Sequence, residues 1–270
     1  MPVPFSQVSD VDRHDAFPTT PSGGGVLLFA GSSGRIEQER ADLLAAHGIR
    51  VRAIRWFGGA GQRAVPHEVP LELFIDELDS LRAECDHVSI FGTSFGAEAA
   101  LLTATLRPVH AVVAASPSSV AWGGVQDGRW SSHWTLDGRA LPWVPFDEEW
   151  MPRHDPPEYL SLYETSLHRD TAATEAATIP VERIAAPVIL TAGGDDRVWP
   201  SAEFAAAIVK RRAGHGLQTE LFSAPGAGHR LLLPGESVAT GGMSMRRGGD
   251  EESDRALGNR VWPPVLDALR

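Results

Sequence analysis

The segment Gly92-Thr93-Ser94-Phe95-Gly96 has the residue types and the spacing of a nucleophile elbow. It follows the apolar run 87–91 and opens the small-residue segment 97–102, a pattern that predicts a strand, a tight turn and a helix. A serine on such a turn projects its hydroxyl above the sheet, and glycines two residues to either side leave the space it needs. The N–H groups at the start of the helix would favour an oxyanion formed there. Ser94 is therefore the predicted nucleophile, and an ordinary glycine turn is the alternative.

A serine hydroxyl needs a general base and an acid that orients the base. In α/β-hydrolases the acid follows the serine along the chain, and the histidine follows the acid. Asp195 and Asp196 come directly after the apolar strand 187–192, and His229 lies in a glycine-rich turn after a short strand that ends near Phe222. Parallel strands end at one edge of a sheet, so we expect the carboxylate and the imidazole at the edge where ligands bind.

Asp196 is the favoured acid because it lies three residues after Gly193 and four before Pro200. Asp195 is the alternative, and its expected role is to cap the turn or the next helix. Of the ten histidines, only His229 follows a strand, lies in a glycine-rich turn and comes after the acid. We therefore predict a triad of Ser94, Asp196 and His229 that needs no metal ion and no organic cofactor.

Two backbone N–H groups are expected to bind the oxyanion. One belongs to Phe95, the residue after the nucleophile. The other lies in the loop Gly31-Ser32-Ser33-Gly34 after the apolar strand 26–30, where Ser32 is the favoured donor. A plain strand-to-helix turn is the alternative role of this loop. No lysine follows its glycines, which excludes a phosphate-binding loop.

Strands and helices alternate along the chain, which predicts a doubly wound α/β fold with a mostly parallel sheet. We interpret residues 1–24, which are polar and interrupted by proline and glycine, as an arm, and residues 25–270 as one domain. No internal repeat is visible.

The alternation stops between residues 116 and 178, a segment that holds five of the eight tryptophans. A connection this long inside a domain usually has a function, and its tryptophans argue against disorder. We interpret it as a cap over the site. Trp122 and Trp134 of the cap, together with Trp199, are expected to contact an acyl group, and packing within the cap's own core is the alternative.

The composition excludes several classes of function. A net charge of −11 leaves no basic stripe for a nucleic-acid partner. Neither an N-terminal signal nor an apolar run of membrane-spanning length is visible, so a cytoplasmic protein without a membrane span is expected. Cys85 is the single cysteine, so no internal disulfide forms.

Three stretches resemble the C-terminal domain of the acyl-CoA thioesterases and bile-acid-CoA:amino-acid N-acyltransferases. They are Gly31-Ser32-Ser33-Gly34-Arg35-Ile36-Glu37 with Ala45-Ala46-His47-Gly48, then residues 92–98, then residues 179–229 around the acid and the histidine. The likeness extends over about residues 24–268. It implies an α/β-hydrolase fold and a Ser94, Asp196, His229 triad that acts on a small-molecule acyl thioester such as an acyl-CoA.

Two features differ from the family pattern. The thioesterases carry a lysine after the nucleophile, where this chain has Phe95, and longer members have an N-terminal β-sandwich domain for which the residues before Val26 leave no room. Members that transfer acyl groups to amines characteristically use cysteine as the nucleophile, so Ser94 resembles the hydrolytic branch.

The charge distribution also bears on the substrate. With a net charge of −11 and Phe95 in place of lysine, we expect weak electrostatic capture of CoA phosphates and a shallow dependence of turnover on salt. Arginines such as Arg35, Arg55 and Arg230 would favour a polyanionic substrate only if they cluster.

Hydrolysis of an acyl thioester is thus the predicted function. A carboxylesterase or peptidase, or an acyltransferase with an amine or alcohol acceptor, would use the same triad. A non-catalytic binding protein on the same fold is the alternative from another class, and it is disfavoured because all three triad positions are intact.

Overall fold

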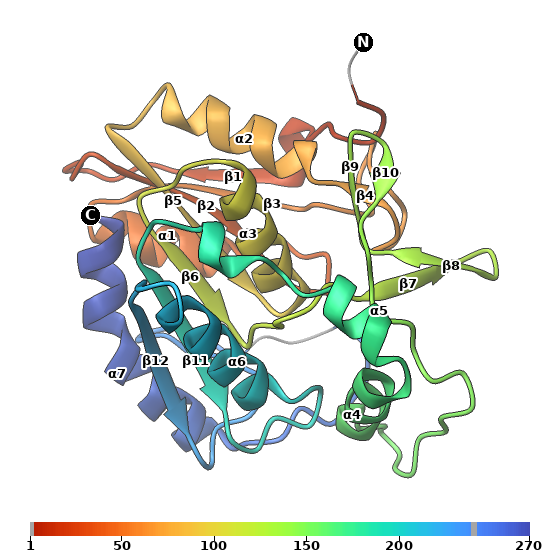
Figure 1. Ribbon diagram of the computed structural model, residues 1–270. Coiled ribbons are helices and arrows are strands. Elements are labelled where there is room, and N and C mark those ends of the chain that lie inside the picture. Colours follow the sequence, from red (N-terminus) through yellow and green to blue (C-terminus); the bar gives the residue numbers. More distant parts are fainter. Residues whose placement is uncertain (1–2, 239–241) are drawn as a thin grey trace.

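Helices surround a seven-stranded sheet in the computed structural model of the chain, which describes residues 3–238 and 242–270 (Figure 1). All neighbouring strands pair in parallel except β1, which runs antiparallel to β3 at one edge. In spatial order the strands are β1 (Arg13–Ala16), β3 (Arg50–Ile54), β2 (Gly24–Phe29), β5 (His87–Thr93), β6 (Val112–Ala115), β11 (Val188–Gly193) and β12 (Thr219–Ala224). This order and direction confirm the predicted doubly wound α/β fold.

The inner strand β2 shows why the sheet is covered on both faces. All six of its residues are buried. Val26 and Leu28 belong to the core on one face, and Leu27 and Phe29 to the core on the other, because successive side chains of a strand alternate. A continuous apolar run of this kind is typical of a parallel strand between two layers of helices.

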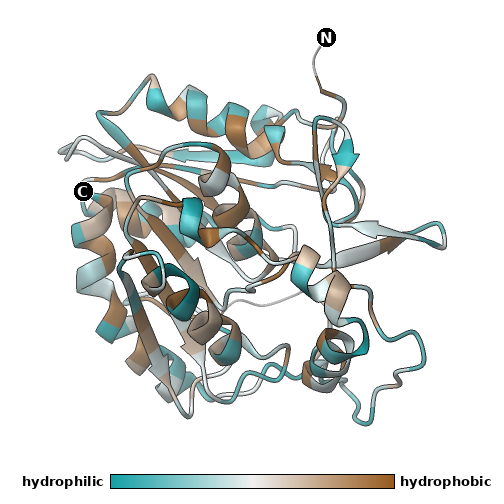
Figure 2. Ribbon diagram, viewed as in Figure 1, coloured by the Kyte–Doolittle hydropathy of each residue, from teal (hydrophilic) through white to brown (hydrophobic). Residues whose placement is uncertain are grey.

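Five helices form these two layers. α1 (Gln38–Ala46) and α7 (Glu251–Leu269) pack against the face of Val26 and Leu28. The opposite face is covered by α2 (Glu72–Arg82), α3 (Phe95–Leu106) and α6 (Ser201–Ala213). Figure 2 shows hydrophobic residues concentrated on the strands and on the helix surfaces that turn toward them. The described helices include none with the length and apolarity that a membrane-spanning helix needs.

The insertion between β6 and β11 lies to one side of the sheet (Figure 1). Strands β7 and β8 form a hairpin, and β9 pairs with β10 and with β4 from the segment before α2. The elements involved are β4 (Val69–Pro70), β7 (Gly123–Gln126), β8 (Arg129–Ser132), β9 (Trp134–Leu136), β10 (Arg139–Ala140), α4 (Leu160–Arg169) and α5 (Thr171–Ala176). The strands among these elements have two to four residues each, too few to produce a clear period in the sequence.

Part of the predicted arm belongs to the sheet. Strand β1 follows the short 3₁₀ helix Asp10–Asp12, and its register pairs Arg13 with Ile54. A second 3₁₀ helix, Val181–Arg183, precedes β11. The sheet therefore begins before residue 25, and the first two residues of the arm lie outside the described residues.

Candidate active site

Ser94 occupies the turn between β5 and α3. Its backbone φ is 58°, a conformation that residues other than glycine rarely adopt. A Cβ at Gly92 would lie 2.1 Å from the carbonyl oxygen of Gly96, and a Cβ at Gly96 would lie 2.5 Å from that of Ala30. Both distances are shorter than atoms allow, so the turn forms only with glycine at these two positions. The turn has the geometry of a strained nucleophile elbow.

Ser94, His229 and Asp196 lie in one hydrogen-bonded row at the C-terminal edge of the sheet. Ser94 Oγ is 2.9 Å from His229 Nε2, and His229 Nδ1 is 2.8 Å from Asp196 Oδ2. A carboxylate only accepts, so Nδ1 donates to Asp196 and Nε2 is left to accept the proton of the serine hydroxyl. This arrangement meets the geometric requirements for a nucleophile, its general base and the acid that orients the base.

The loop after β11 fixes the carboxylate of Asp196. Its Oδ1 accepts the backbone N–H groups of Val198 at 2.8 Å and Trp199 at 3.3 Å. Its Oδ2 is left for His229, and the side chain is only 2% exposed. The backbone thus sets the orientation of the acid, and the acid sets that of the imidazole.

Asp195, the alternative acid, has other partners. Its Oδ1 accepts from Arg197 Nε at 2.7 Å, and its Oδ2 accepts the N–H of Gly249 at 2.9 Å. The bond from Gly249 and then the one from Arg197 lower the pKa of this carboxyl. Of the two neighbouring aspartates, the structure brings Asp196 and not Asp195 to the histidine.

Segments far apart in the sequence hold the backbone of His229. Its N–H donates to the carbonyl oxygen of Arg247 at 3.0 Å, and its own carbonyl oxygen accepts from Ser116 Oγ at 2.9 Å. Gly228 has no room for a side chain, because a Cβ there would lie 2.2 Å from the carbonyl oxygen of Gly248. Ser116 is not among the predicted site residues. Its place directly after β6, at the ligand-binding edge, is the one signal that points to it.

Ser32 and Phe95, the predicted oxyanion donors, both line the cavity beside Ser94. The described residues include no acceptor for the backbone N–H of either one. The loop of Ser32 lies close to the nucleophile, since a Cβ on Gly31 would be 2.7 Å from Ser94 Cβ. Two unengaged N–H groups at this place are what an oxyanion site requires, and their role stays a prediction.

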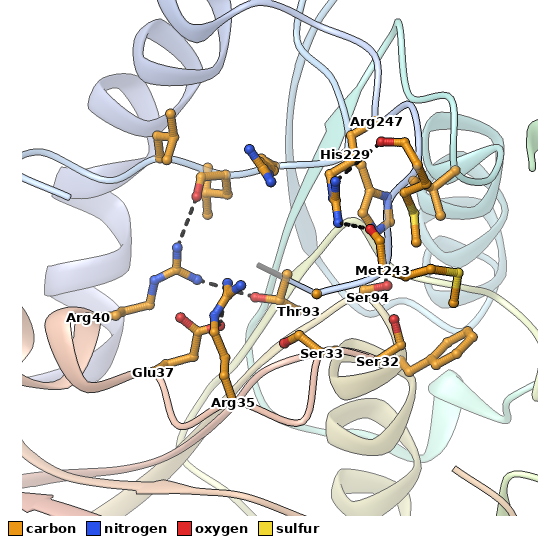
Figure 3. Close-up of a pocket in the computed structure, with 18 of the residues that line it drawn as sticks. Ser32, Ser33, Arg35, Glu37, Arg40, Thr93, Ser94, His229, Met243 and Arg247 are labelled. Atoms are coloured by element: carbon orange, nitrogen blue, oxygen red, sulfur yellow. Dashed lines mark hydrogen bonds and ion pairs between the residues drawn. The ribbon is translucent and has the colours of Figure 1, made fainter. Parts of the chain in front are cut away.

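A cavity of about 470 Å³ opens above Ser94, with Ser94 and His229 among its lining residues (Figure 3). This volume is in the range of pockets that hold small organic ligands. Its walls come from the loop after β2, the start of α3, the cap and the segment that follows His229. The apolar side chains of the lining include Ile36, Phe95, Tyr159, Leu162, Tyr163 and Met243. Three of them, at 159, 162 and 163, have the spacing of one helix face at the start of α4, a signal present in the sequence.

The three tryptophans predicted to contact the acyl group do not line this cavity. Trp122, Trp134 and Trp199 are fully buried and belong to the hydrophobic core. Glu98 of α3 holds two of them, since its Oε1 accepts the backbone N–H of Trp122 at 3.0 Å and the indole N–H of Trp134 at 2.5 Å. The ring of Trp199 packs beside the imidazole of His229, with the two ring centroids 5.7 Å apart. The three rings therefore pack in buried clusters. Trp122 and Trp199 belong to a small cluster with residues of the insertion, whereas Trp134 packs in the main core beside Trp56 and Phe74.

A buried ion pair stabilises the wall of the cavity. Arg40 of α1 donates to the two carboxylate oxygens of Glu236 at 2.6 and 2.8 Å. Burial opposes both charges, but their attraction outweighs it, so the pKa of Arg40 is raised and that of Glu236 is lowered. Arg40 also donates to the carbonyl oxygen of Leu231 at 3.0 Å and to Thr93 Oγ1 at 3.3 Å. The pair thus joins the loop after His229 to the strand before Ser94.

Three further arginines line the same cavity, and two of them are residues named above as candidates for a cluster. Arg35 pairs with Glu37 at 2.8 Å. Burial lowers the pKa of Arg230 and Arg247, and the charge of Arg35 lowers it further in both. Arg55, the third candidate, instead lies 3.5 Å from Asp12.

Comparison with known families adds to this geometry. Residues 71–251 match the family described as "BAAT / Acyl-CoA thioester hydrolase C terminal". The chain belongs to this family. The matched span contains Ser94, Asp196 and His229, and the match confirms the resemblance found in the sequence.

Members of the family with curated descriptions are distant relatives of this chain. It is 26% identical over 262 residues to Acyl-coenzyme A amino acid N-acyltransferase 2 of Mus musculus, covering 91% of this chain and 59% of that protein. It is 24% identical over 229 residues to Acyl-coenzyme A thioesterase 1 of Mus musculus, covering 82% of this chain and 52% of that protein. The chain spans about half the length of the curated relatives it matches.

Several solved structures have the same fold as this chain. The crystal structure of Paleococcus ferrophilus monoacylglycerol lipase is 19% identical with a TM-score of 0.54, covering 97% of this chain and 98% of that one. A probable hydrolytic enzyme from Pseudomonas aeruginosa PAO1 is 16% identical with a TM-score of 0.54, covering 96% and 89%. At these identities the likeness concerns the fold alone, and that fold is the α/β-hydrolase.

Proposed function

We propose that the protein hydrolyses an acyl thioester, or a related acyl ester, through an acyl-serine intermediate. The observation that carries the proposal is the row of hydrogen bonds from Ser94 through His229 to Asp196 beside a cavity of ligand size. Membership of a family of acyl-CoA thioester hydrolases supports a thioester as the substrate.

In the first half-reaction, His229 Nε2 removes the proton of Ser94 as Oγ bonds to the carbonyl carbon. The N–H groups of Ser32 and Phe95 donate to the oxyanion. Asp196 accepts the Nδ1 proton throughout, which keeps the imidazole in the required tautomer and stabilises the imidazolium. The carbon–sulfur bond then breaks, and His229 gives its proton to the leaving thiolate.

In the second half-reaction, water replaces the thiol. His229 removes a proton from water as its oxygen attacks the carbonyl carbon of the acyl-serine. The bond between this carbon and Ser94 Oγ breaks, and Oγ recovers the proton from His229. One thioester and one water thus give one acid and one thiol, with no change of oxidation state.

Acyl transfer is the second candidate, and the similarity to an acyl-coenzyme A amino acid N-acyltransferase favours it. In that reaction an amine or alcohol acceptor takes the place of water in the second half-reaction. The products separate the two functions, since transfer yields the acyl conjugate of an added acceptor such as glycine and hydrolysis yields the free acid.

Labelling and turnover test the proposed hydrolysis. We expect a serine-directed fluorophosphonate to label the unmodified protein, and the protein to turn over butyryl-CoA or p-nitrophenyl butyrate. Ser94→Ala should lose the label and at least about 10³-fold in kcat while its circular dichroism stays unchanged. Ser223→Ala, on β12 and outside the cavity lining, is the matched control. Near-normal turnover by the Ser94→Ala protein would overturn the assignment.

A further inference from the structure

The cavity carries more positive charge than the chain as a whole. The net charge of the chain is −11. Among the described lining residues, however, four arginines (Arg35, Arg40, Arg230 and Arg247) face three glutamates, and neither lysine nor aspartate contributes. The space beside Ser94 is therefore locally cationic in an acidic protein, and this local excess is what a negatively charged ligand would meet.

Ion pairing accounts for only two of these arginines. Arg40 is saturated by its buried pair with Glu236 at 2.6 Å. Arg35 pairs with Glu37 at 2.8 Å while 41% of its side chain remains exposed, so it keeps donors for a further acceptor. The remaining charges, on Arg230 and Arg247, are without a carboxylate partner among the described residues.

The surroundings of Arg230 and Arg247 disfavour two guanidinium charges that have no carboxylate partner. Both side chains are partly buried, and among the described residues Arg247 donates to neutral carbonyl oxygens alone, those of Met243 at 2.9 Å and Met245 at 3.3 Å. All three side chains line one cavity, and burial together with the charge of Arg35 lowers the pKa of the other two guanidinium groups. Such partly desolvated charges cost free energy unless an anion compensates them.

Asp254 of α7 opposes the repulsion from Arg35 at Arg230, and it acts at a distance. Its carboxylate accepts the N–H of Gly228 at 2.8 Å and forms no direct ion pair with Arg230. Figure 3 shows Arg35 and Arg247 extending from different segments toward the same hollow, with Ser94 and His229 at its side. Arg230 follows His229 directly in the chain.

We propose that Arg35, Arg230 and Arg247 form an anion subsite that binds a carboxylate or phosphate group of the substrate while its acyl carbonyl lies at Ser94. The inference rests on the proposed function and adds the chemical class of its substrate. Planar guanidinium groups bind both kinds of anion through paired N–H donors, which is why arginine and not lysine suits such a site. The carboxylate would belong to the acyl chain, and the phosphate to the carrier.

Two pairs of substrates test the subsite and locate the anion. Mono-p-nitrophenyl glutarate against p-nitrophenyl butyrate varies the charge on the acyl side. Butyryl-CoA against S-butyryl-N-acetylcysteamine varies it on the thiol side. Arg230→Gln and Arg247→Gln should each lower kcat/KM about 10-fold to 100-fold for the anionic member of at least one pair. The neutral members should change less than about 3-fold, within the range of an ordinary surface substitution.

The matched control is Arg139→Gln, which removes the same charge from exposed strand β10 outside the cavity lining. A loss confined to the glutarate ester assigns the anion to the acyl chain, and a loss confined to butyryl-CoA assigns it to the carrier. Either result supports the subsite. Equal losses on charged and neutral substrates would mean that the arginines serve the fold or the chemistry, and no loss on any substrate would mean that they bind nothing. Both results overturn the inference.

Calorimetric binding separates this inference from the proposed function. Glutarate and free CoA are titrated into the unmodified protein and the Arg230→Gln protein, a measurement that needs no turnover. Binding that disappears in Arg230→Gln, in a protein inactive on all four substrates, would retain the anion subsite and reject the hydrolase. Turnover that depends on Ser94, without anion binding and without preference for anionic substrates, would retain the hydrolase and reject the subsite.

Discussion

Gly31 and Ser94 are in contact although they lie in turns that follow different strands of the sheet, β2 and β5. A Cβ on Gly31 would stand 2.7 Å from Ser94 Cβ, 3.0 Å from the carbonyl oxygen of Thr93 and 3.2 Å from Ser94 Oγ. The φ of Gly31 is not in the left-handed region, so space and not backbone conformation requires glycine here. The loop that carries Ser32 approaches Ser94 this closely only because residue 31 has no side chain.

Gly31→Ala should therefore impair activity more than stability. The added methyl group must displace Ser94 Oγ or the loop of Ser32 by a fraction of an ångström or more, and a misplacement of this order costs about 10²-fold in rate. Gly214→Ala at the end of α6, where a Cβ would meet atoms no closer than 3.4 Å, is the control. We expect kcat to fall in Gly31→Ala and not in Gly214→Ala, measured with one ester and checked by thermal unfolding. Full activity in Gly31→Ala would remove the loop of Ser32 from the mechanism.

Asp196→Asn should damage catalysis far more than Asp195→Asn. An amide at position 196 can donate to Nδ1, which would favour the wrong imidazole tautomer, and a comparable change in a serine protease costs about 10⁴-fold in kcat. Asp195 serves Arg197 and the N–H of Gly249, so Asp195→Asn should stay within a few-fold of the unmodified protein. Rates of acylation by p-nitrophenyl butyrate measure the difference. The reverse order would transfer the role of the acid to Asp195.

We expect the ion pair of Arg40 and Glu236 to contribute to the free energy of unfolding. Arg40→Met leaves the carboxylate of Glu236 buried without its counter-charge, which costs about 3–5 kcal/mol in the free energy of unfolding. The double variant Arg40→Met/Glu236→Leu removes both charges and should recover most of this loss. Urea unfolding measures both. A double variant as unstable as Arg40→Met would mean that the hydrogen bonds of Arg40 to Leu231 and Thr93 matter more than the pair.

The same carboxylate predicts how stability depends on pH. The pKa of Glu236 lies below its ordinary value of 4.5 in the folded protein, because Arg40 outweighs the effect of burial. A lowered pKa adds stability that is fully present above 4.5 and is lost as the pH falls through the folded value. The difference in free energy of unfolding between the unmodified protein and Glu236→Gln should therefore be constant near neutral pH and shrink below 4.5. A difference that grows on acidification would contradict this sign.

The sequence predicts the fold and the row of three polar side chains because each of them follows a local pattern. Ser94 lies between two glycines at a strand-to-helix turn, and Asp196 and His229 each leave a strand at the same edge of the sheet. Because parallel strands end at the same edge of the sheet, the topology alone places the three side chains near one another. This is why residues 135 positions apart, Ser94 and His229, are found from short motifs alone.

The substrate cavity is less predictable because it depends on packing between distant segments. Tryptophan content indicates a cap, but it does not distinguish a ring that lines a pocket from one such as Trp134, whose indole N–H is bound by buried Glu98. The cluster of arginines that line the cavity cannot be predicted from the sequence either. Arg35 comes from the loop after β2, whereas Arg230 and Arg247 come from the long connection between β12 and α7, and a net charge of −11 conceals the local excess that they form.

The proposed anion subsite predicts a steeper salt dependence than the net charge of the chain alone does. The Debye length shortens from about 30 Å at 0.01 M salt to about 8 Å at 0.15 M, so capture of an anionic substrate by Arg230 and Arg247 should weaken over this range. We expect kcat/KM for the preferred anionic substrate to fall several-fold, that for its neutral counterpart to stay level, and Arg230→Gln to flatten the profile where Arg139→Gln does not. A level profile for both butyryl-CoA and mono-p-nitrophenyl glutarate in the unmodified protein would contradict the prediction. The arginines of the cavity would then take no part in attracting substrate.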